Sequence, residues 1–296
     1  MNRSSFLDHV AWTGLGIAYA LSPAGIMTGR ALADGMSAAG TIDFVQISDS
    51  HLGFHQASNP DVLSTLKASI DAINALPTQP KFVVHTGDIT HLSKPEQFEA
   101  AKQMLGTLKA PYFALPGEHD VLGNDFKPYL SNFKIPHSTD GGWAAWDQDG
   151  VHFVVLLNVF NFEKMGLMGN DQLSWLEKDL SGVAASTPVV VFTHVPLYAL
   201  YPEWGWTTED GSKALAMLKK FDRVTVLNGH IHQIVTHQEG NIRFASANAT
   251  AYPQPKPGAA PKPGPLALPH DDLLRVIGYR TVELAGDARI EDHPLS

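Results

Sequence analysis

Five short, largely apolar runs in this chain each precede a cluster of carboxylate or imidazole residues. The runs cover residues 42–47, 82–85, 112–115, 189–192 and 224–227. Two residues after each run ends, the clusters begin, at Asp49, Gly87, Gly117, His194 and Gly229. Runs of this length that alternate with helical patterns predict buried parallel strands. Because the carboxyl ends of parallel strands meet at one edge of a sheet, we expect the five clusters to lie together.

The segments between these runs complete an α/β pattern in one domain over residues 41–296. Apolar residues at helical spacing predict helices over residues 61–76, 93–108, 170–180 and 212–221, and two more apolar runs predict strands at 151–157 and 276–284. Ser93 and Glu96 have the spacing of a capping box, which places the start of the second helix at Ser93. The proline-rich stretch 253–269 suits neither a helix nor a central strand, so we expect an extended arm on the surface.

The overall charge and the absence of cysteine narrow the chemistry. The 296 residues include 21 Lys and Arg against 30 Asp and Glu, which gives a net charge of −9. A protein that follows a polynucleotide backbone usually presents a basic stripe, so long nucleic acid is not an expected partner. Without cysteine, any metal must bind nitrogen and oxygen ligands, and 14 histidines can supply the nitrogen.

Residues 1–33 have the pattern of an export signal. Arg3 is followed by an apolar run over residues 10–27, and residues 31–33, Ala-Leu-Ala, offer a small-residue cleavage site. Residues 4–7 are similar to part of a twin-arginine signal, although only one arginine precedes them. We expect export to the periplasm and no stable membrane span in the mature protein. An uncleaved N-terminal anchor is the alternative.

The residue types in the clusters point to metal binding. The clusters are Asp49-x-His51, Gly87-Asp88, Gly117-Glu118-His119-Asp120, His194 and Gly229-His230-x-His232. On an extended segment, residues two positions apart point to the same side, as in the first and last of these motifs. In this order, over residues 49–232, the motifs resemble those of the calcineurin-like metallophosphoesterases.

The resemblance implies a fold, a ligand set and an activity. The implied fold is a single-domain, four-layer α/β/β/α sandwich with two ions of iron, manganese or zinc at one edge. The resemblance places Asp49, His51 and His232 on one ion, Glu118, His194 and His230 on the other, and Asp88 between them. The implied activity is hydrolysis of a small phosphomonoester or phosphodiester by metal-bound hydroxide, with no covalent enzyme intermediate.

Glu118 departs from the family pattern, which has asparagine at this position. A carboxylate can ligate a metal but cannot donate a hydrogen bond, and it adds a negative charge. We expect tighter binding of the second metal, a preference for iron(III) or manganese(II), and weaker binding of a phosphate dianion. By the same resemblance, His119 is a leaving-group acid or a phosphate contact, and Asp120 orients its ring and raises its basicity.

Several residues outside the motifs are candidate substrate contacts. Trp204 and Trp206 follow the fourth cluster and could form a lid or stacking wall over the metals. Trp143 and Trp146 follow a Gly-Gly turn and could do the same. The alternative for both pairs is packing of aromatic rings against the core. Asn158, just after an expected strand, is a candidate phosphate contact.

Other functions on the same site stay open at this stage. The site could belong to a cyclic-nucleotide phosphodiesterase or to a pyrophosphate-cleaving hydrolase. A function of another class is a metal-binding or sensing protein in which Glu118 weakens catalysis. Three further histidines near the motifs, His55, His85 and His91, are expected to be packed or solvated rather than functional.

Overall fold

The computed structural model describes residues 43–122, 126–159, 166–284 and 288–296, together with three short N-terminal strands. Those strands are β1 (Ala11–Trp12), β2 (Ala20–Ser22) and β3 (Gly25–Met27), and β2 and β3 form a separate antiparallel pair. The export signal expected at residues 1–33 therefore lies largely outside the described residues. Within the described part of the chain, no helix is long and apolar enough to cross a membrane.

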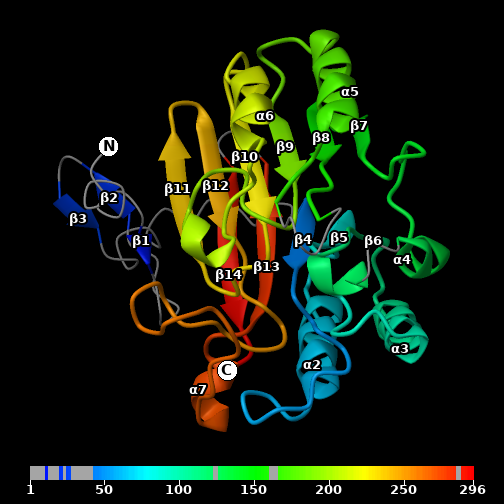
Figure 1. Cartoon of the computed structure of the whole chain (residues 1–296), viewed down its shortest axis with the longest axis vertical. Helices are drawn as coiled ribbons and strands as arrows, with labels where there is room; N and C mark the ends of the chain where they lie inside the picture. Colours follow the sequence, from blue (N-terminus) through cyan, green and yellow to red (C-terminus); the bar gives the residue numbers. More distant parts are fainter. Residues whose placement is uncertain are drawn as a thin grey trace.

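A seven-stranded sheet forms one half of the molecule (Figure 1). Besides β1, its strands are β7 (Ala144–Gln148), β8 (Val151–Val155), β9 (Val189–Phe192), β10 (Val224–Asn228), β11 (Val235–Glu239) and β12 (Ile242–Ser246). Their order is β1-β11-β12-β10-β9-β8-β7. The central strands β8, β9, β10 and β12 are parallel, whereas β1, β7 and β11 pair antiparallel.

A five-stranded sheet forms the other half. Its strands are β4 (Phe44–Ile47), β5 (Phe82–His85), β6 (Tyr112–Ala114), β13 (Gly278–Glu283) and β14 (Arg289–Pro294). Their order is β14-β13-β4-β5-β6, with β4, β5 and β6 parallel and β13 and β14 antiparallel. The strand predicted at 276–284 is β13, but β14 follows it. β14 is an edge strand of mostly polar residues, Arg-Ile-Glu-Asp-His-Pro, so it lacks the apolar run that marks a buried strand.

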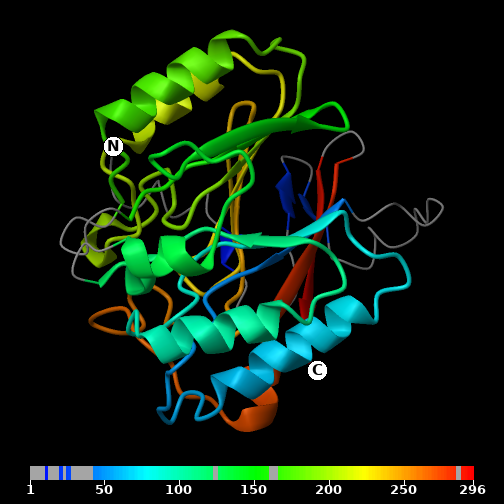
Figure 2. The ribbon, with the colours of Figure 1, turned by 90° about the vertical axis from the view of Figure 1, so that its right-hand side faces the viewer.

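Helices cover the outer face of each sheet and give four layers (Figure 2). The longer helices are α2 (Val62–Asn74), α3 (Pro95–Leu105), α5 (Asn170–Ser181) and α6 (Gly211–Leu218), and the short ones are α4 (Lys127–Asn132) and α7 (His270–Leu274). Buried residues of α5 and α6 pack on the seven-stranded sheet, and those of α2 and α3 pack on the five-stranded sheet. The predicted α/β/β/α sandwich is thus confirmed.

Aromatic side chains fill the layer between the two sheets. The rings of Phe44 and Phe82 stack with centroids 5.1 Å apart, and Phe44 meets Phe192 of the opposite sheet edge to face at 5.3 Å. Trp146 stacks on Phe153 at 5.2 Å in the same layer. Packing therefore accounts for Trp146, and the expectation that it forms a lid over the metals is wrong.

The start of α3 also differs from the sequence-based expectation. Ser93 does not cap this helix, because α3 begins at Pro95 and Lys94 occupies the N-cap position. The Ser93 hydroxyl instead donates to the backbone carbonyl of His119 at 2.7 Å, and Ser93 has a left-handed φ of 50°. Its role is to fix the third motif to the loop after β5.

One buried arginine joins the two sheets. Arg280 of β13 is 1% exposed and forms a bidentate pair with Asp292 of β14, at 2.8 and 3.0 Å. It also donates to the Gln46 side chain of β4 at 3.3 Å. Two more hydrogen bonds cross to β12, to the carbonyls of Ala245 at 3.3 Å and Ser246 at 2.8 Å. A guanidinium can serve these acceptors at once because its donors form a fixed planar fork.

We predict that Arg280→Lys lowers the free energy of unfolding by about 2–4 kcal/mol, because one ammonium cannot reach acceptors on both sheets. Urea unfolding of the two proteins measures the difference. The matched control is Arg275→Lys, since Arg275 and its partner Asp272 are 60% and 49% exposed; this change should cost less than about 0.5 kcal/mol. Equal effects at the two positions would contradict the sheet-joining role.

Candidate metal centre

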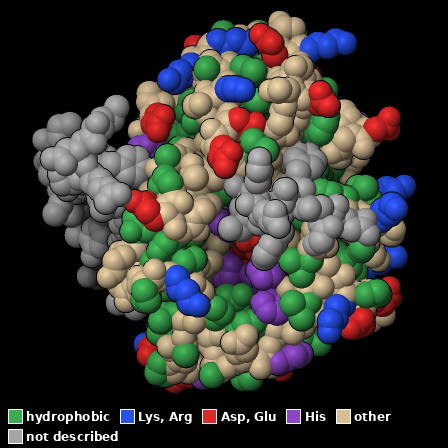
Figure 3. Space-filling view, viewed as in Figure 1, with side chains coloured by type: hydrophobic (Ala, Val, Ile, Leu, Met, Phe, Trp, Pro, Cys, Tyr) green, Lys and Arg blue, Asp and Glu red, His purple; other side chains and the backbone are tan. Residues whose placement is uncertain are grey.

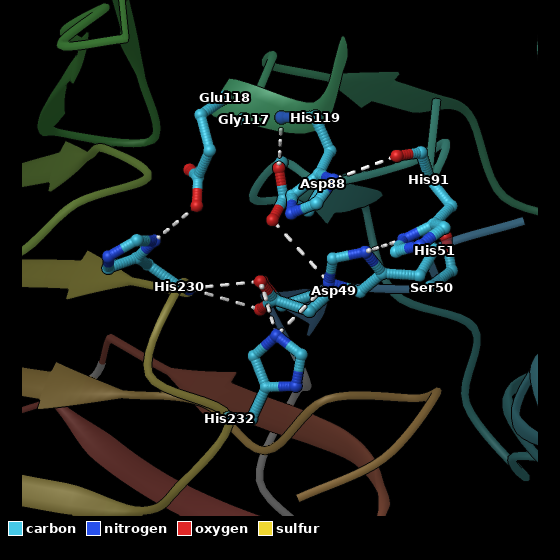
Figure 4. Close-up of polar contacts among 12 residues, drawn as sticks. Asp49, Ser50, His51, Asp88, His91, Gly117, Glu118, His119, His230 and His232 are labelled. Atoms are coloured by element: carbon cyan, nitrogen blue, oxygen red, sulfur yellow. Dashed lines mark hydrogen bonds and ion pairs between the residues drawn. The ribbon is translucent and has the colours of Figure 1, made fainter. Parts of the chain in front are cut away.

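The candidate ligands lie where strands from both sheets end (Figure 4). From the five-stranded sheet come Asp49 and His51 after β4, Asp88 after β5 and Glu118 after β6; from the seven-stranded sheet come His194 after β9 and His230 and His232 after β10. Each of these residues is at most 6% exposed. The structure therefore brings together all the residues predicted as metal ligands, and histidine side chains are visible in the central hollow of the molecule (Figure 3).

Four of these residues form one group. Asp49, His51, Asp88 and His232 each offer a ligand atom, and those atoms all lie within 4.8 Å of one another. His232 Nε2 is 3.3 Å from Asp49 Oδ1, and His51 Nε2 is 3.4 Å from Asp88 Oδ2. Two carboxylates and two imidazoles are a suitable donor set for a divalent transition metal.

Glu118, His194 and His230 form a second group. Glu118 Oε2 lies 2.9 Å from His194 Nε2, and Glu118 Oε1 lies 2.9 Å from His230 Nδ1. Asp88 Oδ2 is 3.6 Å from His194 Nε2 and 3.4 Å from His51 Nε2 in the first group. One carboxylate oxygen thus lies between the two groups, which is where a bridging ligand of a two-metal site is needed.

Buried polar atoms without hydrogen-bond partners indicate that this site fits cations. Among the described residues, these atoms include Glu118 Oε2, His194 Nε2 and both ring nitrogens of His230, whose close contacts are the 2.9 Å ion-pair distances within the group rather than hydrogen bonds. An unpaired buried polar atom costs about 1–3 kcal/mol, so such groups normally have a partner or coordinate a metal. One ligand atom each of Glu118, His194 and His230 lies within 4.8 Å of the other two, and the residues present therefore fit a bound metal.

Backbone carbonyls set the tautomer of two imidazoles. His194 Nδ1 donates to the Thr86 carbonyl at 2.7 Å, and His232 Nδ1 donates to the Tyr252 carbonyl at 2.6 Å. A carbonyl only accepts, so Nδ1 carries a proton and Nε2 is the nitrogen that faces the site. Burial, followed by repulsion from neighbouring imidazoles, holds the pKa of His51 well below its ordinary value, which keeps this ring neutral.

The charges of the second group stabilise each other against burial. Burial by itself raises the pKa of the Glu118 carboxyl, but attraction to His230 and His194 brings it well below its usual range. Burial likewise lowers the pKa of His194, but Asp88 and Glu118 raise it well above the ordinary value of a histidine. The Glu118 carboxylate is therefore ionised and strongly attracts positive charge.

Most of the ligands have an uncommon backbone conformation. Asp49, His51, Asp88, His230 and His232 have φ angles of 52°, 43°, 54°, 68° and 52°. They are five of the eight non-glycine residues with positive φ among the described residues. Such conformations cost on the order of 1 kcal/mol or more each and persist where the surroundings fix them. The motif residues are thus held in turns that aim their side chains inward.

Neighbouring groups fix these turns. The Asp49 carboxylate accepts the backbone N–H of His230 at 3.0 and 3.2 Å, which ties the first motif to the last. At Gly117, a Cβ atom would lie 2.1 Å from Asp88 Oδ1 and 2.4 Å from the Asp88 backbone nitrogen. Only glycine allows this approach, so Gly117 is required for the position of Asp88.

Asp120 has a different role from the one expected. The His119 ring donates through Nδ1 to the His91 carbonyl at 2.8 Å. The Asp120 carboxylate instead accepts the backbone N–H groups of Ile89, Thr90 and Gly117 and the Thr90 hydroxyl. The prediction that Asp120 orients the His119 ring is therefore wrong. The prediction that it raises the basicity of that ring is borne out, because burial lowers the pKa of His119 but Asp88, Glu118 and, to a smaller extent, Asp120 raise it above its ordinary value. Asp120 stabilises the turn that carries Asp88. Burial, with repulsion from Asp88, raises the pKa of Asp120 to about 6.

A cavity of about 300 Å³ opens over the two groups. Trp204 and Trp206 line it, although they are only 8% and 1% exposed, so they both pack the loop and form part of the wall. Trp143 is not among its lining residues. Its ring lies 6.2 Å from that of Trp175, on the helix side of the seven-stranded sheet. The expectation that Trp143 lies over the metals is thus not met.

The same cavity includes residues that sequence reasoning missed. His91 lines it, with its ring stacked on His119 at 5.0 Å, so its packing agrees with the expectation but its place beside the site was not foreseen. Tyr252 also lines it and stacks on His51 at 5.0 Å. The position of His91 three residues after Asp88 was a usable signal for it. For Tyr252, the one signal in the sequence was its position at the start of the proline-rich arm.

Asn158 does not face the cavity. Its side chain is fully buried and donates to the Val195 carbonyl and the Thr208 hydroxyl, both at 2.8 Å. Its Oδ1 accepts the Val195 backbone N–H at 3.2 Å. With these contacts made, the amide has no role as a phosphate contact, and the earlier interpretation is wrong. Asn158 fixes the segment that follows His194.

Comparison with known proteins identifies the family. A sequence model of the calcineurin-like phosphoesterases matches residues 42–234, and the chain therefore belongs to this family. It is 28% identical over 204 residues to a glycerophosphodiester phosphodiesterase of Enterobacter lignolyticus, over 67% of this chain and 70% of the relative. It is 24% identical over 219 residues to a 3′,5′-cyclic-nucleotide phosphodiesterase of Nostoc, over 71% of this chain and 79% of the relative.

Solved structures share the fold. A dimetal phosphatase from Danio rerio superposes with a TM-score of 0.65 at 13% identity, covering 87% of this chain and 97% of that one. A purple acid phosphatase from yellow lupin gives a TM-score of 0.57 at 15% identity, covering 84% of this chain and 51% of that one. Together, the family, the relatives and the cluster of potential ligands define the protein as a metal-dependent phosphoric ester hydrolase.

Proposed function

We propose that this protein hydrolyses phosphodiester monoanions in preference to phosphomonoesters, at a centre of two metal ions. In this proposal Asp49, His51 and His232 hold one ion, Glu118, His194 and His230 hold the other, and Asp88 bridges them. The observation that carries the preference is Glu118, whose carboxylate oxygens lie 2.9 Å from both His194 Nε2 and His230 Nδ1. An additional carboxylate also favours a hard ion on this side, and manganese(II) is the one that keeps both ions divalent.

The charge of the site supports a monoanionic substrate. Three carboxylates, Asp49, Asp88 and Glu118, belong to the two ligand groups. With two divalent ions the formal sum is +4 − 3 = +1, equal and opposite to the single charge of a phosphodiester. Among the described residues that line the cavity there is no lysine or arginine. The second negative charge of a phosphomonoester would therefore go uncompensated.

The relatives are consistent with this preference. The Enterobacter lignolyticus and Nostoc proteins are both named as phosphodiesterases, one for glycerophosphodiesters and one for 3′,5′-cyclic nucleotides. A serine/threonine-protein phosphatase of Danio rerio is 26% identical over 235 residues, over 66% of this chain and 71% of the relative. The charge of the metal centre favours the diester substrates of the two phosphodiesterases over the substrate of a phosphatase.

The residues around the centre have separable tasks. When bound, the two ions supply Lewis acidity toward the phosphoryl oxygens and toward an attacking water. The backbone N–H of His119 donates to Asp88 Oδ1 at 2.9 Å, which holds the bridging carboxylate. The His119 ring, fixed through Nδ1 to the His91 carbonyl at 2.8 Å, lines the cavity, where it can give a proton to the leaving alcohol.

We predict that Glu118→Asn shifts selectivity toward the monoester. p-Nitrophenyl phosphate and methyl p-nitrophenyl phosphate share a leaving group and differ by one negative charge. Removing the Glu118 charge should lower the ratio of kcat/KM for the diester to that for the monoester on the order of tenfold. Steady-state kinetics give the ratio, and elemental analysis of the same samples gives the metal content.

Glu177→Asn, on the exposed side of α5, is the matched control and should leave the ratio unchanged. An unchanged ratio in fully metal-loaded Glu118→Asn protein would refute the role of Glu118. Metal-loaded wild-type protein that cleaves neither compound would refute the proposed function itself.

We also propose that the protein works outside the cytoplasm. The support is the sequence pattern of residues 1–33, with Arg3, an apolar run and the Ala31-Leu32-Ala33 site. Mass spectrometry of the protein recovered from its native compartment should give a mature N-terminus at Asp34. Full-length protein confined to the cytoplasmic fraction would contradict export.

A further inference from the structure

A second and larger cavity lies beside the metal centre, under the proline-rich arm. Its volume is about 640 Å³, which is within the range of sites for ligands larger than a phosphate group. Five residues line both cavities, namely His232, Gln254, Pro263, Gly264 and Pro265. Because one of them is a candidate metal ligand, the larger cavity directly borders the place where a phosphoryl group would bind.

Hydrogen bonds fix the arm in this position. Its base is closed by the Leu266 backbone N–H, which donates to the Pro253 carbonyl at 2.9 Å. Gln254 Nε2 donates to the His230 carbonyl at 2.9 Å, and Gln233 Nε2 donates to the carbonyls of Gln254 and Pro255 at 3.0 and 2.9 Å. His230 and Gln233, which precede and follow His232 in the sequence, therefore hold the arm in place. Prolines restrict its backbone further, so the cavity wall is largely preformed.

The lining of the larger cavity differs from that of the metal centre. Prolines and the aliphatic side chains of Ile234, Leu266, Leu268 and Val276 make up much of it. Among the described lining residues there is no carboxylate, and the two lysines of the arm are the charged groups. The chain as a whole has a net charge of −9, so this lining departs from the average surface. It suits an apolar group that carries no positive charge.

We propose that this cavity binds an apolar alcohol group of the phosphoester substrate while the phosphoryl group occupies the metal centre. The inference rests on the proposed function and adds a substrate class to it: phosphodiesters in which one alcohol is a large aryl or alkyl group. Small polar alcohols leave the cavity filled with water and gain nothing from its lining. The shared rim at Gly264 and His232 provides the passage for the ester bond.

The test compares the binding of two stable, monoanionic probes to metal-loaded full-length protein. These are the phosphinates methyl(1-naphthylmethyl)phosphinate and dimethylphosphinate, which have no ester bond to hydrolyse and differ in one substituent, naphthylmethyl in place of methyl. We expect the Kd of the naphthyl probe, measured by calorimetry, to be lower by on the order of tenfold or more. Leu266→Asp, which places a carboxylate in the apolar lining, should remove most of this difference without changing the Kd of the methyl probe.

Two further variants make the test specific. Leu266→Met keeps an apolar side chain and should keep the difference. Leu63→Asp changes a leucine of similar exposure outside both cavities, 45% against 37% for Leu266, and should also keep it. Equal affinity for the two probes in wild-type protein, or an unchanged ratio in Leu266→Asp, would overturn the inference.

The result is separable from that for the proposed function. Tight, Leu266-dependent binding of the naphthyl probe supports the cavity even if methyl p-nitrophenyl phosphate is not cleaved, in which case the proposed function fails alone. Cleavage of that diester with no preference between the two probes means that the cavity inference fails alone.

Discussion

The carboxylate of Asp88 is the group on which the site depends. It is 2% exposed, and its Oδ2 lies 3.4 Å from His51 Nε2 and 3.6 Å from His194 Nε2. His51 follows a strand of one sheet and His194 a strand of the other, so the two ligand groups face each other only because the sheets do. Burying this carboxylate among two others is costly without cations, and the arrangement is therefore that of a metal site.

The contacts that join the sheets also reach the ligands. Arg280 of β13 donates to the Gln46 side chain, whose Nε2 donates to the Thr86 hydroxyl at 3.0 Å. The Thr86 carbonyl accepts from His194 Nδ1 at 2.7 Å. A continuous path of buried hydrogen bonds thus runs from the sheet-joining arginine to a metal ligand. Rigid support of this kind explains how strained turns, such as that at Asp88 with a φ of 54°, persist in the folded protein.

Sequence reasoning identified the parts of the site that follow local rules. Asp49, Asp88 and His194 each follow a buried apolar strand, and strand ends of an α/β sheet meet at one edge. Tyr252 and Gln254 come from a proline-rich segment with no periodic pattern, and only tertiary hydrogen bonds bring that segment to the metal centre. The edge strand β14 was missed for a related reason, since an exposed strand has no apolar run.

Position in the sequence also gave wrong predictions, for Asp120 and for Asn158. Asp120 is adjacent to His119, but its carboxylate is taken up by backbone N–H groups of the turn that carries Asp88. Asn158 follows a strand end as the ligands do, yet its amide bonds the backbone of Val195. In both cases a buried polar side chain satisfies backbone groups, which is the commoner role of such residues and depends on partners distant in sequence.

Anomalous X-ray diffraction from crystals of metal-loaded protein tests the two-metal centre most directly. Two anomalous peaks about 3.5–4 Å apart are expected. One peak should lie among Asp49, His51 and His232 and the other among Glu118, His194 and His230, with the Asp88 carboxylate between them. A single peak, or density only beside the rings of His91 and His119, would contradict the two-metal centre.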